Sequence, residues 1–239
     1  MSVAPSVALP HAPAVKSARS VGSGRLALLF AVILTTSLSA FALAFVSFVK
    51  PIGEGDGLPD YAAIAPHRDY VWAFFAIAGV QLIVGACAAA LAAWLLVPDR
   101  GARWATVGGG LVWLGAALYG VGIGGWAAVY YFATDHATLG SATAGRFVDH
   151  VNDDTAHLLA MPIGGAVLIA LGSLTIAVAL WRARTVPRWV PVVGAISAVA
   201  TVVLPPDGVA GLVGEAASSA STIAVGWYAW QRGRAAFSA

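Results

Sequence analysis

The chain has 239 residues, of which 59% are hydrophobic and only 10% are charged, with a formal net charge of +2 and a mean hydropathy of +0.83. Soluble domains carry about 25% charged residues, so these charges are too few to coat a water-facing surface, and we expect a chain solvated by lipid. The single cysteine, Cys87, excludes an intrachain disulfide and a cysteine-based metal cluster, and no basic stripe outside the membrane flanks indicates binding to nucleic acid.

Six apolar runs follow a polar N-terminal segment. Residues 1–24 contain Lys16 and Arg19 without an apolar period, which predicts a disordered, basic cytoplasmic tail. The apolar runs cover 26–49, 70–97, 104–132, 155–181, 189–204 and 209–230. Because about 20 apolar residues cross a bilayer as a helix, we predict an all-α, polytopic transmembrane bundle of six spans within 25–231. A short cytoplasmic tail would then occupy 232–239.

Two of these runs leave an alternative open. The first could be a signal peptide, because Ala42-Leu43-Ala44 resembles a small-residue cleavage site. Its apolar part is, however, longer than the 7–15 residues expected there. The fifth run, at about 1.5 Å per residue, falls short of a hydrocarbon core of about 30 Å. It is therefore either a thin span or a re-entrant hairpin formed with the start of the sixth run.

The basic side chains indicate the orientation, because cytoplasmic loops gather Lys and Arg. With the N-terminus inside, the outer segments hold only Lys50, Arg68 and Arg146. The inner segments hold Lys16, Arg19, Arg25, Arg100, Arg103, Arg182, Arg184, Arg188, Arg232 and Arg234. This bias predicts that both termini are cytoplasmic. It also favours a fifth run that spans, since otherwise Arg232 and Arg234 would lie outside.

Small residues mark the faces on which helices would pack, because lipid gives apolar helices no drive to associate and close backbone contact does that work instead. The third run contains Gly108, Gly109, Gly110, Gly115, Gly120 and Gly124. The fourth run carries Ala166, Ala170, Ser173 and Ala177 on one face. We expect these faces to meet other helices of the bundle, with a homodimer as the alternative.

A cluster of His and Asp precedes the fourth run on the outer side. If this segment is helical, His150, Asp154 and His157 fall on one face at i, i+4 and i+7. Imidazole and carboxylate groups at this spacing can bind zinc or another divalent ion, and His136 could complete the set. We therefore consider a divalent metal or haem site at the outer face. The alternative is that Asp153 or Asp154 caps the helix that follows.

Glu215 is the only acidic residue inside a predicted span. It shares one helical face with Gly211, Ser218 and Thr222, and Gln81 of the second run could be an interhelical partner. Because a charge in lipid is costly, such a residue usually faces the bundle interior or a water path. Such a residue would be the natural proton or cation site in a transporter. The alternative is a neutral, hydrogen-bonded Glu that serves packing.

The segment Ala179–Trp189 reads Ala-Leu-Trp-Arg-Ala-Arg-Thr-Val-Pro-Arg-Trp. It resembles a cytoplasmic junction in small, six-helix bacterial membrane proteins classed as domains of unknown function. The resemblance covers about the last ninety residues of the chain and implies no activity, cofactor or site residue.

Three functions are compatible with these patterns. No nucleophile constellation, phosphate-binding loop or dinucleotide fingerprint occurs, which favours a non-enzymatic accessory or scaffold protein with an unknown membrane partner. The alternatives are a small proton- or ion-coupled transporter using Glu215, and a metal- or haem-binding protein. The excess of Arg over Lys is typical of a high-GC bacterium, so we expect a multi-pass protein of the bacterial plasma membrane.

Overall fold

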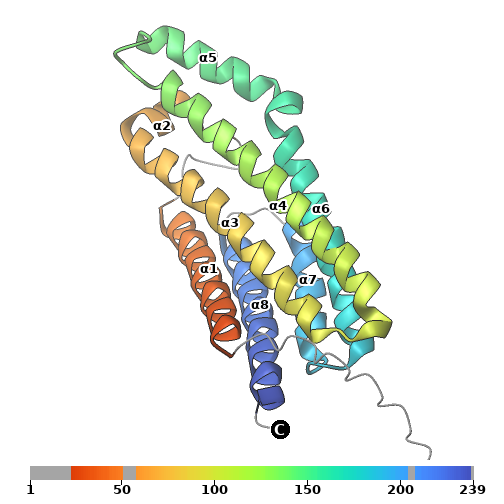
Figure 1. Cartoon of the computed structure of the whole chain (residues 1–239). Helices are drawn as coiled ribbons and strands as arrows, with labels where there is room; N and C mark the ends of the chain where they lie inside the picture. The colour runs from red at the N-terminus through yellow and green to blue at the C-terminus, as the bar shows by residue number, and fades with distance from the viewer. Residues whose placement is uncertain (1–22, 51–57, 204–207, 238–239) are drawn as a thin grey trace, which may run out of the picture.

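Long helices make up the structure, a computed structural model that describes residues 23–50, 58–203 and 208–237 (Figure 1). The described residues contain no strand. Five helices are long and apolar enough to cross a membrane, and a sixth apolar helix, α7 (Trp189–Val203), is shorter. The five are α1 (Ser23–Val49), α3 (Arg68–Leu96), α4 (Asp99–Ala133), α6 (Thr155–Ala183) and α8 (Gly208–Phe237). The chain is therefore a multi-pass membrane protein.

The six apolar helices form a closed ring. Each contacts its neighbours in the order α1, α3, α4, α6, α7, α8 and back to α1, with the most extensive contact between α4 and α6. In addition, α3 and α8 contact each other across the ring. This contact divides the bundle into a small compartment between α1, α3 and α8 and a larger one between α3, α4, α6, α7 and α8. The two compartments position the two polar sites described below.

Many large apolar side chains point outward, and small residues are common where helices meet, as packing in lipid favours. Leu28, Val80 and Val121 are more than 60% exposed, whereas Ala92, Ala116 and Ala179 are fully buried. The closest approach of two backbones at these glycines joins α4 to α6: a Cβ added at Gly115 would lie 2.6 Å from the carbonyl oxygen of Gly165, and one at Gly172 would lie 2.6 Å from that of Gly108.

The expectation that the glycines of the third run make helix contacts is thus confirmed for some positions and wrong for others. Gly120 packs against Gly79 of α3, while Gly124 faces open space. Gly122 had not been singled out, yet it contacts Pro162 of α6. Gly108, Gly115 and Gly122 are spaced by seven residues, a repeat that brings successive positions to the same helical face.

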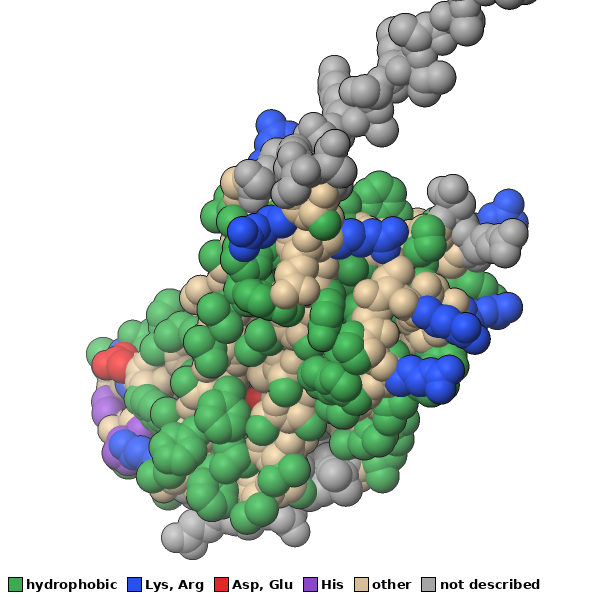
Figure 2. Space-filling model, turned by 90° about the horizontal axis from the view of Figure 1, so that it is seen from below, with side chains coloured by type: hydrophobic (Ala, Val, Ile, Leu, Met, Phe, Trp, Pro, Cys, Tyr) green, Lys and Arg blue, Asp and Glu red, His purple; other side chains and the backbone are tan. Residues whose placement is uncertain are grey.

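One end of the bundle carries the start of α1 and the end of α8, which lie side by side (Figure 1). There the Phe30 ring stacks on Trp230 with 5.6 Å between centroids, and Arg232 donates to the carbonyl of Leu96 at 2.8 Å. Arg188 lies over the Trp181 ring at 5.3 Å. Figure 2 looks at this end and shows Lys and Arg side chains spread over it among hydrophobic ones.

The opposite end has a polar cap made of α2 (Tyr61–Ile64), the 3-10 turn η1 (Ala65–His67) and α5 (Ser141–Asp153). Tyr130 at the end of α4 is fully buried in the cap against Ile64, Val71 and Val148. Its hydroxyl donates to Asn152 of α5, whose amide donates to the Pro59 carbonyl at 3.2 Å. These bonds hold α5 against the end of α4 and against the segment that precedes α2.

Several predicted boundaries shift. The third run begins at Asp99, five residues earlier than predicted, so that α4 is 35 residues long. The last run extends through 232–237, where we had predicted a tail. Residues 23 and 24 belong to α1, and the remainder of the predicted N-terminal tail, 1–22, lies outside the described residues.

Candidate functional site

The carboxyl group of Glu215 lies inside the small compartment, where α8 meets α1. The hydroxyl oxygen of Ser219, one turn further along α8, is 3.0 Å from Glu215 Oε1 and also 3.0 Å from the carbonyl oxygen of Ser37 on α1. Both Ser37 and Ser219 are buried. A hydroxyl has a single hydrogen, so Ser219 can donate to only one of these two acceptors at a time.

Gln81 of α3 lies at the same depth as Glu215. Gly85 packs against Thr36 of α1, where a Cβ at Gly85 would be 3.0 Å from Thr36 Oγ1, and Ser219 bonds to the next residue of α1. Gln81 and Glu215 each precede these contacts by four residues, about 6 Å or one turn, on helices that run in the same direction and contact each other. They therefore share one level and face one compartment.

The amide oxygen of Gln81 is buried and has no hydrogen-bond partner among the described residues. Leaving a buried polar group unpaired costs free energy, so this atom is available to a donor that enters the compartment. The small compartment thus offers a carboxyl group, a hydroxyl and a free amide oxygen between three helices.

Ser218 and Thr222 do not share these surroundings. We had expected them on the same face as Glu215, but they line a separate cleft in the large compartment, while Ser219 is the residue that bonds to Glu215. The sequence held a signal for Ser219, since it follows Glu215 by four residues and neighbours at that spacing meet on a helix. The expected single polar face is therefore divided between two compartments.

This cleft has a volume of about 140 Å³ and lies between α3, α4, α6, α7 and α8. Alanine, valine and isoleucine side chains form most of its wall. Hydroxyl groups enter it from three helices, namely those of Ser173, Thr201, Ser218, Ser221 and Thr222. No charged side chain is among the residues that line it.

The outer His and Asp residues do not assemble as predicted. The chain leaves helical geometry at Asp154 (φ −92°, ψ 55°), which separates α5 from α6, so the prediction that His150, Asp154 and His157 lie on one helical face is wrong. His136 instead contacts the Tyr61 hydroxyl at 3.3 Å. Within the described ranges, no group of three or more His, Cys, Asp or Glu side chains could hold a metal ion.

Asp154 does precede the first residue of α6, as the capping alternative predicted, but its side chain makes no capping bond. Its carboxylate accepts a hydrogen bond from His157 Nδ1 at 2.8 Å. This bond lowers the pKa of the Asp154 carboxyl from its ordinary value. The pair explains the spacing of these two residues without a metal ion.

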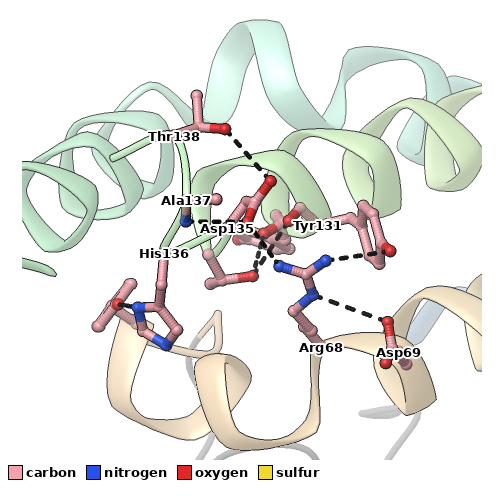
Figure 3. Close-up of polar contacts among 10 residues, drawn as sticks. Arg68, Asp69, Tyr131, Asp135, His136, Ala137 and Thr138 are labelled. Atoms are coloured by element: carbon pink, nitrogen blue, oxygen red, sulfur yellow. Dashed lines mark hydrogen bonds and ion pairs between the residues drawn. The ribbon is translucent and has the colours of Figure 1, made fainter. Parts of the chain in front are cut away.

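A second polar cluster in the cap joins the start of α3 to the end of α4 (Figure 3). The Arg68 guanidinium lies 3.2 Å from Asp135 Oδ1 and donates to the Tyr131 hydroxyl at 3.2 Å. The backbone N–H of Ala137 and, next, Arg68 hold the pKa of the Asp135 carboxyl below its ordinary value. Sequence reasoning did not pair Arg68 with Asp135, although both were predicted to lie at the outer surface.

No family model, no curated protein and no solved structure matches the chain.

Proposed function

We propose that this protein is a proton-coupled carrier of the bacterial plasma membrane, with Glu215 as the group that binds and releases the proton. The observation that carries the proposal is the hydrogen bond from Ser219 to Glu215 inside a three-helix compartment, beside the unpartnered amide oxygen of Gln81. Intramembrane acids are rare and costly, and they commonly mark ion and proton pathways.

The proposed carrier has six spans with both ends in the cytoplasm. The start of α1 and the end of α8 lie at one end of the bundle, which supports an even number of crossings. Since α7 has 15 residues, it covers about 22 Å at 1.5 Å per residue, less than a hydrocarbon core of about 30 Å. Local thinning of the bilayer accommodates a short helix at modest cost. The excess of Arg in the predicted inner segments gives the orientation.

Ser219 would couple the proton to the contact between α1 and α8. When Glu215 is ionised, the Ser219 hydroxyl donates its hydrogen to the carboxylate. When Glu215 is protonated, its own O–H donates to Ser219 Oγ, and the Ser219 hydroxyl turns to the Ser37 carbonyl. Both acceptors lie 3.0 Å from the Ser219 oxygen. Each proton that binds thus adds one hydrogen bond between α1 and α8. Protonation of Glu215 would in this way change how tightly the two helices pack.

Proton binding can be measured directly. In the full-length protein reconstituted in lipid nanodiscs, we expect an infrared carboxylic C=O band that titrates with pH and that disappears in Glu215→Gln. Ser219→Ala should shift the frequency of this band, because it removes the hydrogen-bond partner, whereas Ser39→Ala on α1 should not. If Glu215→Gln leaves the titrating carboxylic bands unchanged, the proposal is wrong.

Transport needs its own measurement, because a group can bind a proton without moving it. In proteoliposomes that enclose a pH-sensitive dye, we expect acidification under an imposed pH gradient to be faster than in empty liposomes. We expect it to fall to the empty-liposome rate in Glu215→Gln and to be retained in part in Glu215→Asp. Equal rates in the wild type and Glu215→Gln would contradict the carrier function. The accessory or scaffold role would then lead, tested by a stably copurifying membrane partner.

A further inference from the structure

The cleft in the large compartment has the size of a small ring-shaped molecule. Its volume is about 140 Å³. An apolar cavity of about 150 Å³ engineered in another protein stays dry and binds benzene. A void of this size deprives the side chains around it of contacts, so an occupant that restores these contacts gains binding energy. The volume of the cleft therefore matches an occupant of about the size of a benzene ring.

The hydroxyl groups of the cleft fall into two kinds. Ser221 donates to the Val190 carbonyl at 3.0 Å, and Thr201 donates to the Ser197 carbonyl at 2.9 Å, so their hydrogens are already used. In contrast, the hydroxyls of Ser173, Ser218 and Thr222 form no hydrogen bond with other described residues. These three come from α6 and α8 and can donate to or accept from a polar atom of an occupant.

The residues that line the cleft also determine which charge an occupant can carry. Because no charged residue lines the cleft, a charged molecule would lose its hydration without gaining a counter-charge, which is costly in an apolar environment. A neutral molecule with an apolar ring and one hydroxyl group matches the volume of the cleft and its apolar walls. Its hydroxyl group can also form a hydrogen bond with one of the free hydroxyls of the cleft.

We propose that the cleft is a binding site for a small neutral ring compound that carries one hydroxyl group, of the chemical class of phenol. Its apolar ring would pack against Ala170, Ala177 and Val225, and its hydroxyl would bond to Thr222. The site lies in a different compartment from Glu215, so it does not depend on the proposed proton function.

Binding is tested with phenol, benzene and benzoate on the full-length protein in nanodiscs of phosphatidylethanolamine and phosphatidylglycerol. Equilibrium dialysis measures the bound compound, and empty nanodiscs of the same composition correct for its partition into lipid. We expect phenol to bind saturably at about one site per chain and benzoate not to bind. Phenol binding that does not exceed partition into empty nanodiscs would overturn the proposal.

Two variants locate the site. Ser173→Leu fills the cleft and should abolish saturable phenol binding, whereas Thr175→Leu, on the same helix but outside the cleft, should retain it. Thr222→Val removes one hydroxyl at nearly constant volume. It should weaken phenol roughly two- to tenfold, the worth of one hydrogen bond, and leave benzene unchanged. The Thr222→Val comparison stands even if Ser173→Leu fails to fold.

The outcomes separate this proposal from other occupants and from the proton function. A phospholipid that copurifies with the wild type, is lost in Ser173→Leu and is not displaced by phenol would assign the cleft to an acyl chain and overturn the proposal. Equal loss of phenol and benzene in Thr222→Val would contradict the hydroxyl contact. Glu215→Gln should bind phenol like the wild type, so failure of one proposal does not decide the other.

Discussion

Helix α6 has two faces built of small residues, and they pack in opposite ways. On the face toward α4, Gly165 and Gly172 meet Gly115 and Gly108 so closely that an added methyl group would collide with backbone atoms. On the face toward α7 and α8, Ala170, Ser173 and Ala177 border a cleft of about 140 Å³.

The difference shows that small residues do not by themselves produce close packing. On the first face both helices are long, and glycine faces glycine, so the backbones approach along the whole contact. On the second face α7 spans only 15 residues, and its contact with α6 is less extensive than the contact of α6 with α4. Close packing thus requires a partner that is small and able to approach along its length.

The largest expected effect is at the tight face. We expect Gly115→Ala to lower the free energy of unfolding by about 1–3 kcal/mol, the usual cost of overpacking, because its Cβ would lie 2.6 Å from a backbone oxygen of Gly165 that cannot move alone. Unfolding by SDS in mixed micelles measures this. Gly124→Ala, which meets nothing within 4 Å, is the matched control. Equal stability of the two variants would contradict the close contact.

A smaller effect is expected where α8 holds α7 beside the cleft. Ser221→Ala removes the hydrogen bond to the Val190 carbonyl, and we expect a loss of about 1 kcal/mol in the free energy of unfolding. Ser218→Ala, whose hydroxyl lines the cleft without a hydrogen bond among the described residues, should change it less. The same unfolding titration compares them, and the reverse ranking would disprove the role of Ser221 as the link to α7.

Filling the cleft should not destabilise the bundle. We expect Ser173→Leu to leave the free energy of unfolding unchanged or to raise it by up to about 1 kcal/mol, as cavity-filling substitutions commonly do. Set against Gly115→Ala on α4, this compares the two contacts of α6: adding three carbons at the open contact would be tolerated where adding one carbon at the tight contact is not. A loss as large as that of Gly115→Ala would show that the cleft is closed in the membrane.

The smallest effect lies outside both faces, in the polar cap. The pKa of Asp135 is lowered by the Ala137 N–H and by Arg68, so the unfolded state binds a proton at higher pH than the folded state. The resulting stabilisation is present above the unfolded value of about 3.9 and is lost as the pH falls through the lowered folded value.

Asp135→Asn should therefore flatten the acid side of the thermal stability profile below about pH 4, while Asp149→Asn, on the exposed side of α5, keeps it. Thermal unfolding followed by tryptophan fluorescence measures both profiles. If thermal stability falls equally at low pH in the wild type and in Asp135→Asn, protonation of Asp135 does not cause the loss of stability. The contacts of α6 should be the same in both variants, since the cap lies beyond them.

Particular residues show how far sequence reasoning reached. Glu215 was predicted as a candidate site residue because an acid in an apolar run is conspicuous in any arrangement. Its partner was not, because the choice between Ser218 and Ser219 depends on which helix lies on each side of α8. The predicted outer site failed for a local reason: the continuous helix that it required is broken at Asp154.

By itself, the sequence determined that the chain is solvated by lipid and that its elements are helices. A chain with few charges and long apolar runs can satisfy its backbone hydrogen bonds in lipid only as helices. The acid within an apolar run is also evident from the sequence alone. The tertiary structure decided which of the small-residue faces closes and which stays open. It also decided that Ser219 bonds to Glu215 and that Arg68 bonds to Asp135. These outcomes depend on the ring order of the helices and on the contact between α3 and α8, which join residues far apart in the chain and leave no periodic signal in the sequence.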